Sequence, residues 1–300
     1  MSGREQPIGK TDRGVTVADR IAFFDVDGTL LSFRTHSMPE TTRVALRELR
    51  KNDVLIYVAS GRALFQLPRA LREGEGDFPG FDGFLCNSGQ ICLDDRGIFR
   101  MTALDPADVR AITEQSMDGS YDIVYMTADR AFTPRHGDLV RRAEENANVR
   151  FDEDSPEEAY KRPVFQMNAF IAPEDEHRIL EVTDNVKLVR WTEDFADIIP
   201  ADGGKDQGVL AVLEHHGIDR SGAYAFGDGG NDVSMLNAVG CGVAMGNADH
   251  RAKAVADVIT TSVDDAGIYR ACVHLGLIDD VLGICGGDRT YTVIEDKGGR

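Results

Sequence analysis

Five short, almost wholly apolar segments recur along the chain, and each one ends next to polar residues or glycine. They are Ile21–Asp25, Val54–Ser60, Phe84–Asn87, Ala223–Gly227 and Gly242–Met245. Apolar runs of four to seven residues are typical of strands in a parallel sheet whose two faces are both covered. We therefore predict that these segments form the buried strands of a central sheet.

Helical patterns follow most of these predicted strands. Pro39–Lys51 places Val44, Leu46 and Leu49 on one side, and similar patterns cover Asn231–Ala238 and Asp249–Ala256. Strands that alternate with helices are the signature of an α/β fold with a doubly wound, Rossmann-like parallel sheet. The sequence thus predicts a core of this class.

The segment between Ser88 and Trp191 has a different texture. It opens with a hairpin pattern, in which Gln90–Leu93 and Ile98–Met101 flank a polar turn, and the hinge is expected at Asn87-Ser88-Gly89. Mixed helical and strand patterns follow at Asp105–Met117, Tyr121–Thr127, Val164–Ile171 and Pro173–Asp184. We predict an inserted α+β domain over residues 88–195, with the core formed by residues 1–87 and 196–300.

Acidic residues follow the first predicted strand in the string Asp25-Val26-Asp27-Gly28-Thr29-Leu30. Two carboxylates at the end of a buried strand are costly unless a cation binds them. Ligands of open α/β sheets bind at these strand ends, and Gly28 lets the backbone approach such a ligand. An ordinary turn that ends the strand is the alternative.

A second acidic string, Gly227-Asp228-Gly229-Gly230-Asn231-Asp232, follows the fourth predicted strand. Alone it fits a turn that caps the next helix. Together, two carboxylate-bearing strand ends of one parallel sheet indicate a site for a hard divalent cation with oxygen ligands. Mg²⁺ fits best, because it retains several waters and needs few carboxylates, and because the strings lack the spacing of a calcium-binding EF-hand.

Two weaker signals lie between the acidic strings. In Ser60-Gly61-Arg62, a hydroxyl and the following backbone N–H groups at a strand-to-helix turn can bind an anion. Lys205 opens a predicted helix; alone, a lysine in this position is usually a solvated surface residue. The glycines around Lys205 do not form a nucleotide-binding P-loop, because Ile199 and Asp206 occupy positions that require glycine and serine or threonine.

The order of these motifs resembles the haloacid dehalogenase superfamily. DVDGTL, a strand-end serine, a lysine and GDGGND occur in the family's order, and GDGGNDVSML, VGCGVAMGNA and DDAGI resemble its Cof-like branch of sugar-phosphate and cofactor phosphatases. The resemblance spans about residues 20–280 and implies that the inserted domain is a cap. It differs at Asp206, where many relatives have glycine.

The resemblance implies an Mg²⁺-dependent phosphatase that acts through a phospho-aspartate. It makes Asp25 the nucleophile and Asp27 the general acid and base. It assigns Mg²⁺ to Asp25, the backbone carbonyl of Asp27, and Asp228, with Asp232 acting through water or from behind the ligands. Phosphate oxygens would be bound by the remaining motif residues, Ser60, Gly61, Lys205 and Asn231.

Composition narrows the class of partner. The formal net charge is −18 at pH 7, which argues against nucleic-acid binding and requires a local cation near any phosphate. The chain shows no signal peptide and no apolar run long enough to span a membrane, so we expect a cytoplasmic protein that acts on a small phosphorylated metabolite. The pair His215-His216 is expected to be a solvated helix end, and Trp191 a packing residue.

Three alternatives remain at this point. A phosphomutase or phosphotransferase would pass the phosphate from Asp25 to a second sugar, whereas a silent binding protein would be expected to lack motif residues that are present here. A dehalogenase would lack Asp27. A sugar phosphate is the first expectation for the substrate, followed by flavin mononucleotide or pyridoxal phosphate, and the oligomeric state stays open.

Overall fold

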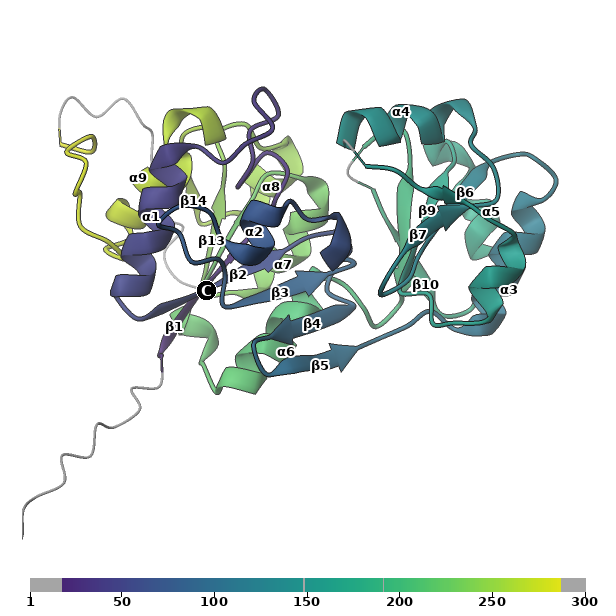
Figure 1. Cartoon of the computed structure of the whole chain (residues 1–300), viewed down its shortest axis with the longest axis horizontal. Coiled ribbons are helices and arrows are strands. Elements are labelled where there is room, and N and C mark those ends of the chain that lie inside the picture. The colour runs from purple at the N-terminus through teal and green to yellow at the C-terminus, as the bar shows by residue number, and fades with distance from the viewer. Residues whose placement is uncertain (1–17, 148, 191, 287–300) are drawn as a thin grey trace, which may run out of the picture.

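The computed structural model describes residues 18–147, 149–190 and 192–286, which form a larger and a smaller body (Figure 1). The larger body contains an eight-stranded sheet and the smaller a six-stranded sheet. The expectation for Trp191 lies outside the described part, as do residues 1–17 and 287–300 of the predicted core. Within that part, no helix has the length and apolarity needed to cross a bilayer.

The core sheet has the strand order β14-β13-β12-β1-β2-β3-β4-β5, and it is parallel from β14 to β3. Its parallel strands are β1 (Arg20–Phe24), β2 (Val54–Ala59), β3 (Gly83–Cys86), β12 (Ala223–Gly227), β13 (Cys241–Ala244) and β14 (Val258–Ile259). All five predicted strands are confirmed, to within one residue at their ends. The order of strands along the chain reverses between β1 and β12, which makes their carboxyl ends the topological switch point of the sheet.

The helices of the larger body cover both faces of this sheet. They are α1 (Glu40–Lys51), α2 (Arg69–Glu73), α6 (Lys205–His216), α7 (Val233–Ala238), α8 (His250–Val255) and α9 (Gly267–His274). Short 3₁₀ turns lie at Leu64–Gln66, Arg220–Gly222, Gly230–Asp232 and Val263–Asp265. Helix α1 packs beside α9, whereas α6 packs beside α7 and α7 beside α8. The predicted doubly wound α/β class is confirmed.

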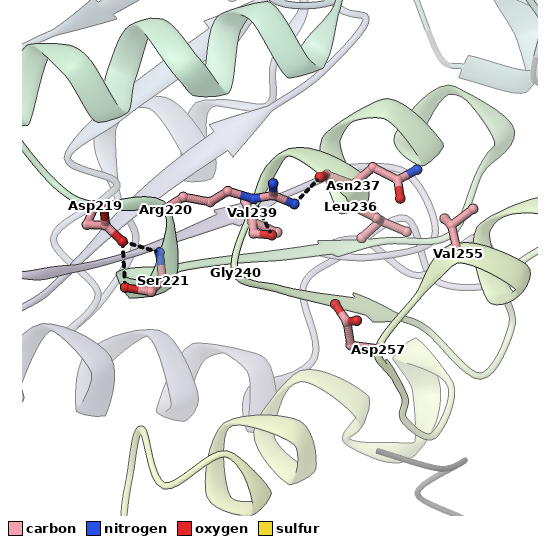
Figure 2. Close-up of a pocket in the computed structure, with 9 residues that line it drawn as sticks. All are labelled: Asp219, Arg220, Ser221, Leu236, Asn237, Val239, Gly240, Val255 and Asp257. Carbon is pink, nitrogen blue, oxygen red and sulfur yellow. Dashed lines mark hydrogen bonds between the residues drawn. The ribbon is translucent and has the colours of Figure 1, made fainter. Parts of the chain in front are cut away.

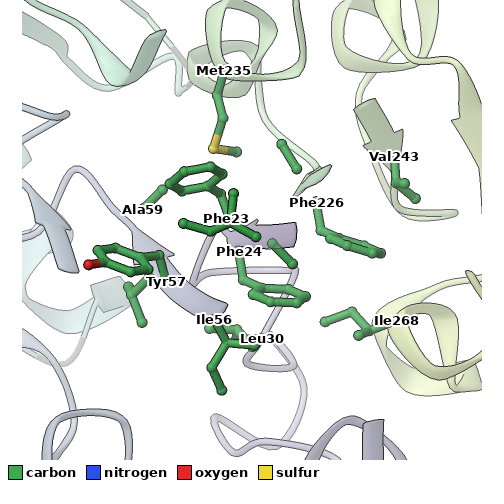
Figure 3. Packing of buried hydrophobic residues seen from close by; sticks show 14 of the residues in the cluster. Phe23, Phe24, Leu30, Ile56, Tyr57, Ala59, Phe226, Met235, Val243 and Ile268 are labelled. Carbon is green, nitrogen blue, oxygen red and sulfur yellow. The ribbon is translucent and has the colours of Figure 1, made fainter. Parts of the chain in front are cut away.

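Aromatic packing fixes the two central strands. Phe23 and Phe24 of β1 are fully buried and point to opposite faces, because successive strand residues alternate. Figure 3 shows Met235 of α7 on the side of Phe23 and Ile268 of α9 on the side of Phe24. Phe24 also stacks on Phe226, with ring centroids 4.8 Å apart, which joins β1 to β12. This packing holds together the two strands that lead into the acidic strings.

The smaller body differs from the predicted domain of residues 88–195 at both boundaries. β4 (Ile91–Asp94) and β5 (Gly97–Met101) form the predicted hairpin, but they pair with β3 and extend the core sheet. β11 (Ala196–Pro200) pairs with β9 and β10 in the smaller sheet. The chain therefore leaves the core after Met101 and returns after Pro200, and we call the part between them the inserted domain. An alternating pattern identifies a strand, but it does not specify which sheet the strand joins.

The predicted hinge at Asn87-Ser88-Gly89 is also wrong, because these residues form the turn between β3 and β4 inside the core. All three have positive φ angles, of 51°, 56° and 86°. A Cβ on Gly89 would lie 2.4 Å from the carbonyl oxygen of Gly204, so this turn requires a glycine there.

The inserted domain has the strand order β10-β11-β9-β6-β7-β8, antiparallel except between β7 and β8. Its other strands are β6 (Asp122–Met126), β7 (Ala131–Thr133), β8 (Asp152–Glu153), β9 (Gln166–Phe170) and β10 (Val186–Val189), and its helices are α3 (Pro106–Ser116), α4 (Asp138–Ala147) and α5 (His177–Leu180), with 3₁₀ turns at Pro156–Tyr160 and Pro173–Asp175. One sheet face packs Ile123, Met167 and Ile198 into a cluster of its own. The other face shares a cluster with Ala63 of the core. This second face of the inserted sheet is thus the one that contacts the core.

The histidine pair at the end of α6 is not a freely solvated helix end. His215 stacks on Phe99 with ring centroids 3.9 Å apart, and its Nε2 lies 2.9 Å from Asp94 Oδ2. The Nε2 of His216 lies 2.6 Å from the hydroxyl of Tyr57. These contacts attach the β4–β5 hairpin and β2 to α6. The position of the pair at a helix end suggested solvent, but residues of the neighbouring strands are its partners.

Candidate active site

Asp25 and Asp27 lie in the loop that follows β1. The N–H of Asp25 still donates to the carbonyl of Phe226, at 2.9 Å, so this residue continues the pairing of β1 with β12. Gly28 has a φ of 84°, and a Cβ there would lie 2.2 Å from Asp228 Oδ2. Only glycine therefore lets the first acidic loop approach the second this closely.

Three carboxylates converge where these two strands end. The side chains of Asp25, Asp228 and Asp232 are buried, and their oxygens lie within 4.8 Å of one another. Asp232 also accepts the backbone N–H groups of Asp228 and Gly229, at 2.9 and 3.0 Å, which closes the second acidic loop around it. The two acidic strings thus meet at one point, as the parallel arrangement of β1 and β12 predicts.

Lys205 joins this cluster from the first residue of α6. Its side chain is only 1% exposed, and its ammonium donates to Asp25 Oδ1 at 2.5 Å and to Asp232 Oδ1 at 2.6 Å. The carboxylate of Asp206 lies against Gly204 and accepts from Gln207 at 3.0 Å instead. The acidic residue next to Lys205 therefore leaves the contacts of the lysine with the cluster intact.

Burial shifts the protonation of the whole cluster. Burial, and then the charge of Asp232, raise the pKa of Asp25 to about 7, although Lys205 acts in the opposite direction. Burial and the charges of Asp25 and Asp232 raise the pKa of Asp228 to about 9. Burial disfavours the ammonium of Lys205, but Asp232 and Asp25 outweigh it, so its pKa is raised. Fully ionised, the three carboxylates would carry more negative charge than one lysine neutralises, and this is why the pKa values of Asp25 and Asp228 are raised.

This donor set fits a hard divalent cation. Three buried carboxylates supply the oxygen ligands that Mg²⁺ prefers, and a dication would neutralise the excess charge. The side chain of Asp27 is not part of the group, because both of its oxygens accept from Arg62. This leaves the backbone carbonyl of Asp27 as the group through which that residue would reach the metal.

The other predicted phosphate-binding residues lie in the loops after β2 and β12, the two strands that flank β1. Ser60 is buried at the end of β2, and its Oγ accepts the N–H of Arg62 at 3.1 Å. Gly61 follows, and a Cβ there would lie 3.6 Å from Asp197 Oδ2 of the inserted domain. Asn231 lies in the 3₁₀ turn Gly230–Asp232, with its Oδ1 close to Gly229. The carboxyl ends of strands β2 and β12 and the first residue of helix α6 thus bring the sequence-predicted residues to the same edge of the core.

The sequence reasoning missed two residues that contact Asp228. The hydroxyl of Thr29 donates to Asp228 Oδ1 at 3.0 Å. The side-chain amide of Asn247 donates to Gly28 O at 2.8 Å and to Asp228 Oδ2 at 3.3 Å. Both residues stand in the quoted strings DVDGTL and VGCGVAMGNA, so the signal was present without an assigned role. They orient the carboxylate that the metal would bind.

Arg251 connects the second acidic loop to the inserted domain. Its guanidinium packs over Gly230, where a Cβ would lie 2.3 Å from Cζ. It donates to Asp249 Oδ2 at 2.7 Å and to the carbonyl of Arg190 at 3.0 Å. The inserted domain therefore touches the core beside the acidic cluster.

Two other groupings carry no site. The pocket in Figure 2 lies at the amino ends of β12 and β13, away from Asp25, and its Arg220 is engaged with the carbonyls of Asn237 and Val239. Asp94 also forms a possible metal-ligating group with the histidine pair of α6, but the guanidinium of Arg96 already donates to Asp94 at 2.6 Å. A cation of the protein itself thus occupies that position.

Raised carboxyl pKa values predict how stability depends on pH. From an ordinary 3.8, the pKa rises to about 7 for Asp25 and about 9 for Asp228, so their contribution to stability is complete below pH 3.8 and is lost as the pH rises through 7 and 9. In EDTA, we expect the thermal unfolding midpoint to fall by about 5 °C between pH 6 and pH 9, and to fall less with Mg²⁺. The variant Asp228→Asn should show a smaller fall. An equal fall in the variant and the wild type would contradict the assignment.

Comparison with known proteins identifies relatives over most of the chain. The model of the haloacid dehalogenase-like hydrolase family matches residues 22–272. YkrA of Bacillus subtilis, a provisionally assigned phosphatase, is 31% identical over 263 residues, which cover 86% of this chain and 98% of YkrA. Phosphatase YwpJ of the same organism is 25% identical over 289 residues, which cover 85% of this chain and 99% of YwpJ.

Solved structures show the same similarity. The subclass IIB sugar phosphatase BT4131 has a TM-score of 0.79 and 30% identity, covering 86% of this chain and 100% of its own. The phosphatase BT1666 from Bacteroides thetaiotaomicron has a TM-score of 0.77 and 30% identity, covering 90% of this chain and 99% of its own. The core and the inserted domain are both included in alignments of this extent.

Proposed function

Since the chain belongs to the haloacid dehalogenase-like hydrolases and is a phosphatase among them, we propose that it hydrolyses a sugar phosphate through a phospho-aspartate on Asp25. The observation that carries this proposal is the buried convergence of Asp25, Lys205, Asp228 and Asp232 at the topological switch point. A carboxylate placed among a lysine and metal ligands is suited to attack a phosphate whose charge they reduce.

Mg²⁺ is the cofactor we propose. It would be held by Asp25, the backbone carbonyl of Asp27, and Asp228, whereas Asp232 would act through a water or by orienting the direct ligands. Once bound, it would reduce the charge on the phosphate and keep Asp25 ionised at neutral pH. Asp232 already organises this site, because it accepts from Lys205 and from the backbone of its own loop.

The reaction proceeds in two displacements. In the first, a carboxylate oxygen of Asp25 forms a bond to phosphorus while the ester P–O bond breaks, and Asp27 gives a proton to the leaving alkoxide. In the second, Asp27 takes a proton from the water that attacks phosphorus, which releases inorganic phosphate and restores the carboxylate of Asp25. The third N–H of Lys205, the hydroxyl of Ser60, the N–H of Gly61 and the amide of Asn231 would bind the non-bridging oxygens.

A sugar as the leaving group is supported by the core-facing side of the inserted sheet. Asn168 and Asp197 lie opposite each other in register, are buried, and bond at 2.5 Å. Gln166 points to the same face, two residues before Asn168 on β9, and its Oε1 has no hydrogen-bond partner in the described part of the chain. Amide and carboxylate groups suit a leaving group rich in hydroxyls better than a flat apolar ring.

A panel of phosphate esters tests this proposal. We expect phosphate release in Mg²⁺ buffer without any added acceptor, with the highest kcat/KM for hexose or pentose phosphates. The variant Asp25→Asn, purified in parallel, measures contaminating phosphatase. A preference for flavin mononucleotide or pyridoxal phosphate would overturn the sugar assignment, and transfer to an added sugar in place of release would overturn hydrolysis.

A further inference from the structure

Arg62 forms a bidentate ion pair with Asp27. Its Nε donates to Asp27 Oδ2 and its Nη2 to Asp27 Oδ1, both at 2.8 Å. The arginine side chain is 17% exposed and the aspartate 30%, so the pair is more sheltered from water than a typical surface ion pair. A planar guanidinium that meets both carboxylate oxygens fixes their direction as well as their position.

The backbone of Arg62 is itself held by two strand ends. Its N–H donates to Ser60 Oγ at 3.1 Å, and its carbonyl accepts the N–H of Asn87 at 3.0 Å. A third contact runs from Nη1 to the carbonyl of Gln66 at 3.4 Å. The guanidinium is therefore placed by the turn after β2 and the turn after β3, and not by the loop that carries Asp27.

Asp27 needs such support more than the other acidic residues do. Asp25 and Asp232 are fixed by Lys205, whereas Asp27 stands outside the cluster. Proton transfer requires hydrogen-bond reach to the leaving oxygen, and a misplacement of about 1 Å can cost about 10²-fold in rate. Arg62 uses one lone pair on each oxygen of Asp27, which leaves another on each to hold the proton that Asp27 gives to the leaving oxygen.

We propose that Arg62 is the positioning residue for the proton-transferring carboxylate of Asp27, an inference that rests on the function proposed above. Arg62 directly follows Ser60 and Gly61 in the chain. One three-residue turn thus sets both the phosphate-binding groups and the direction of the group that protonates the leaving oxygen.

The test compares esters that differ in their need for an acid. Arg62→Ala should lower kcat for a sugar phosphate about 10²-fold, with a much smaller change in KM. Release of nitrophenol from p-nitrophenyl phosphate in a single turnover should fall less than about tenfold, because that leaving group departs without full protonation. Arg62→Lys should recover little of the lost kcat, since a point charge cannot hold both oxygens.

A double-mutant cycle separates positioning from other roles. In an Asp27→Asn background, Arg62→Ala should reduce single-turnover cleavage of the sugar phosphate less than about threefold further, because the group it positions is already lost. Arg69→Ala, which removes an 82%-exposed arginine of α2, is the matched control and should keep wild-type kinetics. Circular dichroism checks that each variant is folded.

Equal losses on both esters, or a further tenfold loss in the Asp27→Asn background, would overturn the role of Arg62. Absence of phosphate release from every ester by the wild-type enzyme would instead overturn the proposed function. The two failures are therefore distinguishable.

Discussion

Replacement of Asp25 by asparagine is expected to abolish turnover, leaving less than about one per cent of wild-type phosphate release. The amide cannot attack phosphorus, so the covalent path is closed, and neither Lys205 nor the metal ligands can substitute for the missing nucleophile. The measurement is steady-state phosphate release in Mg²⁺ buffer, over long incubations at high enzyme concentration. Residual activity above that level would exclude Asp25 as the nucleophile.

Loss of the fold would not account for this result. In EDTA, Asp25→Asn should unfold at a temperature no lower than the wild type, because it removes one of three crowded carboxylates. Asp206→Asn serves as the matched control, since its carboxylate bonds to Gln207 and not to the cluster. This control should retain activity within a few-fold of the wild type. A comparable loss in both variants would mean that activity depends on the number of carboxylates near Lys205 and not on a nucleophile at residue 25.

Removal of divalent cations is expected to stop the reaction, and addition of Mg²⁺ to restore it. The buried carboxylates of Asp25 and Asp228, with pKa values raised to about 7 and about 9, need positive charge that Lys205 alone does not supply. Ca²⁺ should be a poor substitute, because it takes six to eight ligands at longer distances than Mg²⁺. The measurement is phosphate release after dialysis against EDTA, followed by titration with each cation.

A ligand variant sharpens this second experiment. Asp228→Asn should require a much higher Mg²⁺ concentration for half-maximal activity, by about tenfold or more. Asp249 is the N-cap residue of α8, lies next to Asp228 and pairs with Arg251, so Asp249→Asn provides a control with an unchanged requirement. Full activity of the exhaustively dialysed wild type would contradict a metal-dependent mechanism.

Sequence patterns predicted the core well, for a physical reason. A strand buried on both faces must be apolar at every position, so Val54–Ser60 and Ala223–Gly227 could be recognised without knowledge of their neighbours. The convergence of Asp25 with Asp228 then followed, because the carboxyl ends of parallel strands lie at one edge of a sheet. Each inference needed only the local pattern and one rule of topology.

Features that depend on partners could not be predicted in this way. The hairpin Gln90–Met101 was recognised as strands, but its alternation is equally compatible with pairing in either sheet. The pairing of Arg62 with Asp27, 35 residues earlier in the chain, leaves no trace in periodicity. The histidines of α6 were expected in solvent, because the sequence of the helix gives no sign of their partners on β2 and β4. In each case the missing information was which elements are neighbours in space.

The short return from β11 to Lys205 has a consequence for protein engineering. β11 ends at Pro200, Lys205 begins α6, and Gly204 between them adopts a φ of 123°, which favours glycine. A chimera that carries a foreign inserted domain would therefore have to preserve the length of the segment from Pro200 to Lys205, or the lysine would lose its contact with Asp25. The linker that leaves the core after Met101 leads to no residue of the acidic cluster. Linker libraries for such chimeras should accordingly vary this linker and leave the segment from Pro200 to Lys205 unchanged.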